Sequence, residues 1–288
     1  MDVAIHHEVL GADRARPLLL CAGAGAQLLA WPDDLCALLV AHGFCVIRFD
    51  HRDAGLSTHL HEAGPPDFSH GLRAAAAAAA YTLDDMADDA AGVLDALALD
   101  SAHVLGVSMG GMVAQTLAVR HPARVRSLTS IMSTIAADVG RPTAAARAML
   151  LAPPVADRAA AGRRAVDLLR TIGSPGHPLD EAAARDLGER SFDRAYDPEG
   201  GRRQLVAIWA SGDRTAGVRR ITAPTLVLHG AEDPLITLAG AHATAAAIGG
   251  AQLHVYPGMG HDLPRVLWPD LVARVTDLAG RAEAARVG

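Results

Sequence analysis

The chain has 288 residues, half of them apolar, which is enough to bury a large core in one α/β domain that carries a sizeable insertion. The formal net charge is −6 and is spread without acidic or basic blocks, so composition predicts no nucleic-acid or anionic-membrane partner. The chain contains no lysine, which excludes a lysine Schiff base, a Walker lysine and a lysine general base. A small neutral or cationic substrate is expected.

The cysteines and the N-terminus bear on the compartment. The chain has three cysteines, Cys21, Cys36 and Cys45, an odd number without Cys-x-x-Cys spacing. We therefore expect buried thiols, and we expect neither a disulfide framework nor a zinc site. Met1 to Gly11 is polar and lacks the pattern of a secretory signal, and the apolar stretch 18–31 is too short to span a membrane. We expect a cytoplasmic monomer or homodimer that acts on a small molecule.

The first half of the chain alternates strand and helix patterns. Pro17 to Ala22 and Cys45 to Phe49 are short apolar runs, and Trp31 to His42 between them has helical spacing. Thr82 is placed to cap a second helix, which is followed by the apolar run His103 to Val107. This order predicts two strand–helix–strand units.

Three later apolar runs extend the predicted sheet, namely Val125 to Met132, Pro224 to His229 and Gln252 to Tyr256. A mostly parallel sheet covered by helices follows from this pattern. No convincing strand occurs between Thr134 and Arg214, where the sequence is helical and interrupted by prolines. We therefore predict a core of residues 1–133 and 215–288 and a helical cap of residues 134–214, inserted after the sixth strand.

The segment Gly106-Val107-Ser108-Met109-Gly110 lies where a strand is predicted to turn sharply into a helix. A nucleophile elbow has this setting, because the turn holds a serine at φ > 0 and glycines two residues away avoid a clash. The five-residue pattern is weak by itself, so the hypothesis that Ser108 is a nucleophile depends on finding its partners.

Those partners follow in the order acid, then histidine. Asp233 lies in a loop directly after the strand that ends near His229, at the edge of the sheet where open α/β sheets bind ligands. His261 follows the last predicted strand and is flanked by glycines that allow its loop to return over Ser108. Glu232 is expected to be a solvated neighbour of the acid.

A second group of charged residues, Asp50, Arg52 and Asp53, ends another strand. We expect these side chains to form a structural charge network that orders loops near the site.

An oxyanion needs preorganised N–H donors. The backbone N–H of Met109 is one candidate, and Ala24, in the loop after the first long strand, is the other. The same loop contains Gly23-x-Gly25, which begins a dinucleotide-binding fingerprint, but Leu28 stands where that fingerprint needs its third glycine. Nicotinamide or flavin binding is therefore not expected.

With these motifs in place, the chain resembles a serine hydrolase of the α/β-hydrolase superfamily, and in particular the aclacinomycin methylesterase group, which cleaves the methyl ester of an anthracycline polyketide. The blocks that carry the resemblance are Trp31 to Asp33, Val46 to Thr58, Gly106 to Gly111, Ala223 to Leu235 and Pro257 to Pro264.

The resemblance implies a nucleophile at Ser108, an acid at Asp233, a base at His261 and oxyanion donors at Ala24 and Met109. The methylesterase group tends to carry adjacent glycines in the oxyanion loop, whereas this chain has Gly23-Ala24 there. The cap of this chain also looks unlike the cap of that group.

We thus expect a carboxylic-ester hydrolase that forms an acyl-enzyme on Ser108 and needs no metal or organic cofactor. The candidate substrate-binding residues are Leu28, Trp31, Met149, Leu150, Trp209 and Leu235. Two alternatives stay open. The same triad could serve a carbon–carbon bond hydrolase, a lyase or a perhydrolase, and the fold could carry a non-catalytic ligand-binding protein.

Overall fold

The computed structural model describes residues 3–12 and 15–287. Within these residues, seven strands form one sheet in the order β1-β3-β2-β4-β5-β6-β7. β1 is antiparallel to β3, and the other neighbours are parallel. The strands are β1 (His7–Leu10), β2 (Arg16–Cys21), β3 (Phe44–Phe49), β4 (Ala102–Val107), β5 (Val125–Ile131), β6 (Thr225–Gly230) and β7 (Gln252–Tyr256).

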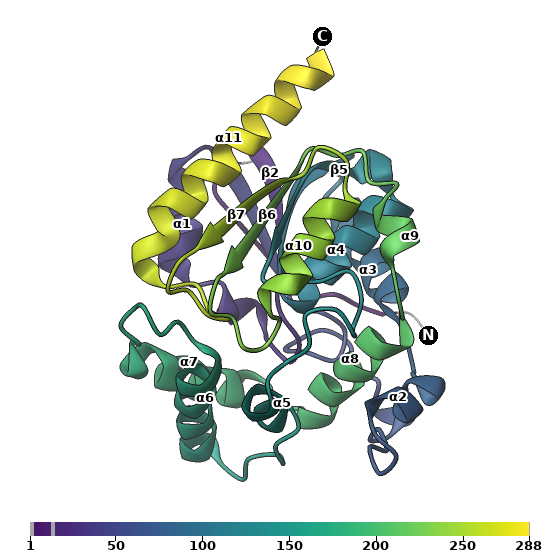
Figure 1. Cartoon of the computed structure of the whole chain (residues 1–288), viewed down its shortest axis with the longest axis vertical. Helices are drawn as coiled ribbons and strands as arrows, with labels where there is room; N and C mark the ends of the chain where they lie inside the picture. The colour runs from purple at the N-terminus through teal and green to yellow at the C-terminus, as the bar shows by residue number, and fades with distance from the viewer. Residues whose placement is uncertain (1–2, 13–14, 288) are drawn as a thin grey trace.

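Helices cover both faces of the sheet (Figure 1). The helices outside the insert are α1 (Asp33–Ala41), α2 (Leu72–Ala75), α3 (Leu83–Ala96), α4 (Met109–Arg120), α9 (Thr215–Val218), α10 (Leu238–Ala247) and α11 (Trp268–Val287). Along β2, Leu18 and Leu20 pack in one apolar cluster with α1 and α11, whereas Leu19 and Cys21 pack in another with α3 and α4. A parallel strand that is buried on both faces needs a continuous apolar run, which explains the composition of β2.

The strand order reverses between β2 and β4, because β2 leads outward to β3 whereas β4 leads to β5 on the other side. Loops that leave two such neighbouring strands diverge, and they leave a crevice at the carboxyl edge of the sheet. The loop with Gly23 and the turn at Ser108 both lie at this edge.

The contact between β4 and α4 depends on glycines. A Cβ atom at Gly106 would lie 2.1 Å from the carbonyl oxygen of Gly110, and one at Gly110 would lie 2.0 Å from the carbonyl oxygen of Cys21. These distances are far below a van der Waals contact, so the first turn of α4 touches the backbone of β2 and β4 directly.

A helical insert separates β5 from β6. It contains α5 (Ala144–Leu150), α6 (Arg158–Ile172), α7 (Glu181–Arg194) and α8 (Pro198–Ala210). These helices lie together beyond the carboxyl ends of the strands, at the bottom of Figure 1. Side-chain caps from Thr143, Asp157, Asp180 and Asp197 begin the four helices. An isolated bridge between Ala136 and Asp213 brings the two ends of the insert together. We refer to the insert as the cap.

The α/β class, the parallel sheet and the helical insert are confirmed, but the expectation that the cap follows a sixth strand is wrong. In the described part of the chain, one antiparallel strand, β1, precedes the parallel strands β2 to β5. The cap therefore follows the fifth strand. The strand β1 was not predicted. It is short and only partly buried, so it lacks the apolar run that revealed the central strands.

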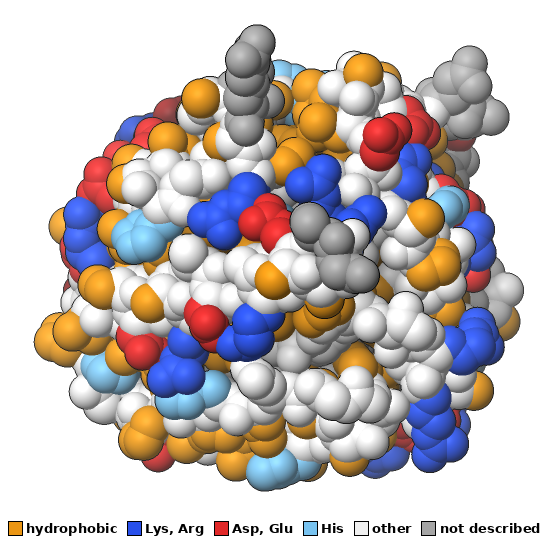
Figure 2. All heavy atoms as spheres, turned by 90° about the horizontal axis from the view of Figure 1, so that it is seen from above, with side chains coloured by type: hydrophobic (Ala, Val, Ile, Leu, Met, Phe, Trp, Pro, Cys, Tyr) orange, Lys and Arg blue, Asp and Glu red, His pale blue; other side chains and the backbone are white. Residues whose placement is uncertain are grey.

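Every helix within residues 3–12 and 15–287 is too short or too polar to cross a bilayer. Figure 2 views the molecule from the end opposite the cap, where basic and acidic side chains lie next to one another. This mixture matches the even spread of charge in the sequence.

The close contact at Gly110 generates the first prediction. Gly110→Ala should lower the free energy of unfolding by at least about 2 kcal/mol, because the new methyl group would push α4 away from β2. Urea unfolding followed by circular dichroism measures the change. The control is Gly92→Ala in α3, where a Cβ meets nothing within 4 Å and the helix should gain about 0.5–1 kcal/mol. A Gly110→Ala variant as stable as the wild type would contradict the argument.

Candidate active site

Ser108 occupies a strained turn between β4 and α4. Its backbone has φ 57° and ψ −121°, a combination that side-chain-bearing residues rarely adopt. Its N–H donates to the carbonyl oxygen of Ile131 at 2.9 Å, and its own carbonyl accepts from the Ser133 hydroxyl at 2.8 Å. Bonds to β5 and to the residues after it therefore hold the turn in place.

Asp233 and His261 form a buried pair. His261 Nδ1 lies 2.7 Å from Asp233 Oδ2, and because a carboxylate can only accept, Nδ1 carries the proton. The other oxygen, Oδ1, accepts from the backbone N–H groups of Leu235 and Ile236 at 2.8 and 2.9 Å. The neutral ring of His261 is thus left with an unprotonated Nε2.

A second histidine supports the acid. His229 Nε2 donates to the carbonyl oxygen of Ile236 at 2.7 Å and lies 3.4 Å from Asp233 Oδ2. Burial lowers the pKa of His229, so the neutral ring is favoured. The neutral His229 ring therefore links the end of β6 to the loop that carries Asp233.

The loop that carries His261 is held by the cap. The His261 N–H donates to the carbonyl oxygen of Ile172, the last residue of α6, at 2.7 Å. The Gly260 N–H donates to Ser174 Oγ at 2.9 Å, and the Ser174 hydroxyl donates in turn to the Asp262 carboxylate. A Cβ at Gly260 would lie 2.2 Å from the carbonyl oxygen of Gly173. The connection after α6 therefore fits against the histidine loop with no room for a side chain.

The loop after β2 lies beside the serine. A Cβ at Gly23 would be 3.6 Å from the Cβ of Ser108, an ordinary contact. His51 Nε2 donates to the carbonyl oxygen of Ala22 at 3.1 Å, and burial lowers the pKa of His51 to about 4. Gly25 donates its N–H to Gln204 Oε1 of the cap at 2.7 Å. This loop is thus fixed from the core on one side and from the cap on the other.

A cavity of about 1390 Å³ opens between the sheet and the cap. Ser108, His261 and Ala24 line it from the core, and most of its lining is apolar. Met109, the first residue of α4, follows Ser108, and the first N–H groups of a helix have no partner within the helix. The strained serine and the histidine of the buried pair therefore face one cavity.

Four of the six side chains predicted to bind substrate line this cavity, and two do not. Trp31, Leu150, Trp209 and Leu235 are among the lining residues. Leu28 and Met149 are not among them in the part of the chain that the structure describes.

The reason lies in the turns that carry Leu28 and Met149. In the 3₁₀ turn Leu28–Ala30, Leu28 is fully buried with its N–H bonded to Asp50 Oδ1 at 2.7 Å, and Leu29 lines the cavity instead. At the end of α5, Leu151 lines the cavity in addition to Leu150. Neighbouring residues of a helical turn point in different directions, so a sequence that does not show how the turn is placed cannot distinguish them.

The expected charge network is present, and it reaches the cap. Asp50 pairs with Arg194 at 2.8 Å, and Asp53 accepts two bonds from Arg203, both at 2.8 Å. Arg52 pairs instead with Asp89 of α3 at 2.6 Å. The two aspartates after β3 thus bind arginines at the end of α7 and within α8.

Three supporting residues were not predicted: His51, His229 and Ser174. His51 follows the buried strand β3, and His229 lies near the end of the buried strand β6. These positions could have distinguished the two from the other histidines among the fourteen. Nothing in the sequence could place Ser174, because it meets the histidine loop 86 residues away through tertiary packing alone.

The sequence profile that describes the α/β hydrolase fold matches residues 16–264. The chain belongs to the α/β hydrolase fold family. It is 31% identical to the rhodomycin D methylesterase DauP of Streptomyces sp. (strain C5), over 95% of this chain and 94% of that one. It is 30% identical to a 2-hydroxymuconate semialdehyde hydrolase of Pseudomonas sp. (strain CF600), over 94% and 89% of the two chains.

Solved structures of the family share the architecture of this α/β hydrolase. The enol-lactonase of Burkholderia xenovorans LB400 superposes with a TM-score of 0.72, covers 95% of each chain and is 24% identical. At that identity the similarity establishes the fold alone.

The contact between the cap and the histidine loop generates the second prediction. Ser174→Ala should lower the free energy of unfolding by about 1–3 kcal/mol, because it leaves the Gly260 N–H and the Asp262 carboxylate without their partner. Hydrogen exchange in residues 258–262 should also become faster. The exposed Ser69→Ala is the control and should change stability by less than about 0.5 kcal/mol. Equal effects of the two substitutions would refute the role of Ser174.

The buried His51 generates a pH prediction. Its pKa is about 4 in the folded protein and about 6.5 when unfolded, so the unfolded chain binds the proton more readily. Stability is therefore lost as the pH falls from about 6.5 to 4, by up to about 3 kcal/mol from this residue. Chemical unfolding at several pH values should show a shallower loss in His51→Gln. Parallel curves for the two proteins would show that His51 is not responsible.

Proposed function

We propose that this α/β hydrolase is a carboxylic-ester hydrolase that uses Ser108, Asp233 and His261 as its catalytic residues. The Ser108 hydroxyl attacks the ester carbonyl carbon while His261 Nε2 takes its proton, and the resulting imidazolium returns that proton to the departing alcohol. Water then hydrolyses the acyl-serine by the same route and releases the carboxylic acid. Asp233 holds the His261 tautomer and stabilises its cation.

The observation that carries this proposal is that the His261–Asp233 pair and the strained Ser108 share one cavity. A serine needs a base to become nucleophilic, and the base needs an acceptor for its other nitrogen. The 2.7 Å bond from His261 Nδ1 to Asp233 supplies the acceptor that the base needs. It leaves Nε2 free to take the proton of the serine. The shared cavity lets a substrate reach both residues.

The N–H groups of Met109 and Ala24 are the proposed donors to the oxyanion. Met109 begins α4 directly after the nucleophile, and Ala24 lies in the loop whose Gly23 approaches Ser108. Two fixed N–H groups at a helix N-terminus and a rigid loop stabilise developing negative charge, each by a factor of about 10²–10³ in rate. No metal or organic cofactor takes part in this scheme.

The substrate class is proposed from the cavity and from the similarity to a methylesterase. A cavity of about 1390 Å³ with a mainly apolar lining suits a large, mostly apolar ester. Trp31 contributes a buried indole N–H that has no partner within the described residues, so it is available to a polar group of the substrate. A methyl ester of a polyketide-like molecule meets these requirements, and we propose this class.

Carbon–carbon bond hydrolysis is the second candidate. The observation that favours it is the 30% identity with a 2-hydroxymuconate semialdehyde hydrolase over 94% of this chain. The same serine, histidine and acid could cleave a vinylogous diketone in place of an ester, with a departing enolate that takes the proton on carbon instead of a departing alcohol that takes it on oxygen.

The test compares wild type with Ser108→Ala on a panel of p-nitrophenyl esters, methyl esters and a vinylogous diketone. Ester turnover should fall by a factor of about 10⁴ or more in the variant, and an organophosphonate should label Ser108 in the wild type alone. Asp233→Asn should lower turnover by about 10⁴-fold, because the amide favours the wrong His261 tautomer. Ser69→Ala, which changes an exposed serine, is the matched control.

Each outcome selects one function. Turnover of the diketone but not of esters, with Ser108 labelled, would replace the esterase by the carbon–carbon hydrolase. No labelling and no turnover in a folded wild type would leave a ligand-binding protein with this fold.

A further inference from the structure

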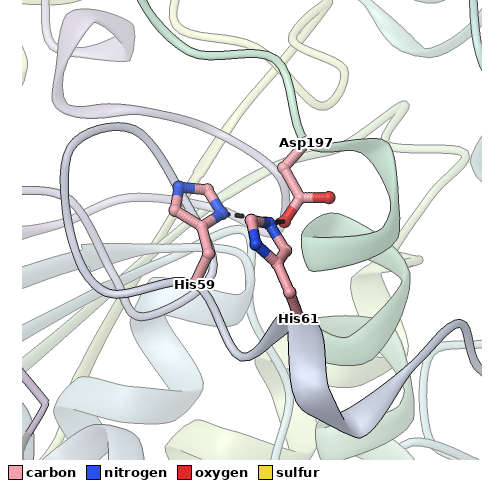
Figure 3. A group of neighbouring side chains, drawn as sticks. All are labelled: His59, His61 and Asp197. Carbon is pink, nitrogen blue, oxygen red and sulfur yellow. Dashed lines mark hydrogen bonds and ion pairs between the residues drawn. The ribbon is translucent and has the colours of Figure 1, made fainter.

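A cluster of two histidines and one aspartate lies outside the proposed catalytic residues. His59 follows β3 in a loop, His61 begins the 3₁₀ turn His61–Ala63, and Asp197 is the N-cap residue of α8. One ligand atom from each side chain lies within 4.8 Å of the others. Figure 3 shows both imidazole rings facing the carboxylate from one side. The cluster therefore joins the core to the cap.

The distances within the cluster match those of a metal site. Asp197 Oδ2 lies 2.8 Å from His59 Nδ1 and 3.2 Å from His61 Nε2. Ligand atoms bound to one Zn²⁺ at about 2.0–2.1 Å lie about 3.0–3.4 Å apart. His59 Nδ1 and His61 Nε2 lie within 4.8 Å of each other, so the exposed His61 ring would turn toward the ion to complete the set.

The hydrogen bonds of His59 direct one ring nitrogen, Nδ1, toward the cluster. Its Nε2 lies 2.9 Å from the carbonyl oxygen of Gly55, which can only accept, so Nε2 carries the proton. Nδ1 lies 2.8 Å from Asp197 Oδ2, and because a carboxylate also only accepts, this nitrogen donates to it in the absence of an ion; a bound metal ion would take the place of that proton. Histidine ligands of metals have this arrangement, in which the distal N–H donates to a backbone carbonyl.

Asp197 is fixed in a similar way. Its Oδ1 accepts from the N–H groups of Glu199 and Gly200, both at 3.1 Å, and its Oδ2 accepts from Arg203 at 3.1 Å. Arg203 also binds Asp53, so one guanidinium neutralises only one of the two carboxylates. The second carboxylate is left to the two histidines, or to a cation that replaces the His59 proton.

Access to the cluster is open at one ligand only. The His61 side chain is 72% exposed, whereas those of His59 and Asp197 are 18% and 13% exposed. An ion could therefore enter from solvent through the side of His61 and still retain water at its remaining positions.

The geometry points to a site for a first-row divalent transition ion, of which Zn²⁺ is the probe, formed by His59, His61 and Asp197. Imidazole nitrogens and a carboxylate suit this class of ion better than Mg²⁺ or Ca²⁺, which prefer oxygen ligands alone. None of the three residues lines the cavity that holds Ser108 and His261 in the described part of the chain, and the ion would fasten the start of α8 to the loop after β3. No metal was expected from the sequence, because the proposed catalytic residues need none and the cysteines lack Cys-x-x-Cys spacing; Asp197 lies 138 and 136 residues from the two histidines.

Titration calorimetry of the chelator-treated full chain with Zn²⁺ tests the site, together with hydrogen exchange at residues 197–200. We expect one saturable site per chain, a higher unfolding temperature with Zn²⁺ and slower exchange at the start of α8. His61→Ala should weaken binding by about tenfold or more and abolish both other effects. This substitution should not disturb folding, because His61 is exposed.

His242→Ala is the matched control, since it removes an exposed histidine of α10 outside the cluster and should leave Zn²⁺ binding unchanged. Binding that is equal in wild type and His61→Ala, or weakened equally in His242→Ala, would overturn the proposal. The cluster would then be an ion pair between a protonated His59 and Asp197.

Discussion

The close approach of α4 to the backbone of β2 and β4 is the constraint on which the rest of the site depends. With glycine at positions 106 and 110, the helix starts directly against two strands, and Ser108 is held at φ 57°. A residue in that conformation costs on the order of 1–3 kcal/mol, which the surrounding bonds to Ile131 and Ser133 must offset. Because β2 is one of the two strands, the same contact brings the loop after β2 beside Ser108.

The cap is attached to the core by polar contacts as well as by apolar ones, since Ala207 of α8 joins a core cluster and Leu235 packs with Ala146 and Ile172. The ion pairs Asp50–Arg194 and Asp53–Arg203 join the loop after β3 to the cap. Charge pairs with buried carboxylates need matched geometry, and breaking one is costly because its partner stays buried. The cap is thus held in a defined position over a large cavity that remains open to a substrate.

The proposed base is fixed from both sides of that cavity. Asp233 orients the His261 ring from the core, while the carbonyl oxygen of Ile172 binds its backbone N–H from the cap. A change in the position of the cap would therefore also move the imidazole. This arrangement couples the cap to the residues proposed to act on the substrate.

The sequence by itself determined the sheet, most of its strands, the helical insert and the positions of Ser108, Asp233 and His261. Buried parallel strands need continuous apolar runs, and a sharp strand-to-helix turn needs glycines, so both leave local patterns. The short, half-buried β1 leaves no such pattern. Only the tertiary structure decided that Leu29 lines the cavity in place of Leu28, that Ser174 holds the histidine loop, and that Asp197 meets His59. Those contacts join residues far apart in the chain, or depend on which way one turn of helix faces, and neither property is contained in local residue spacing.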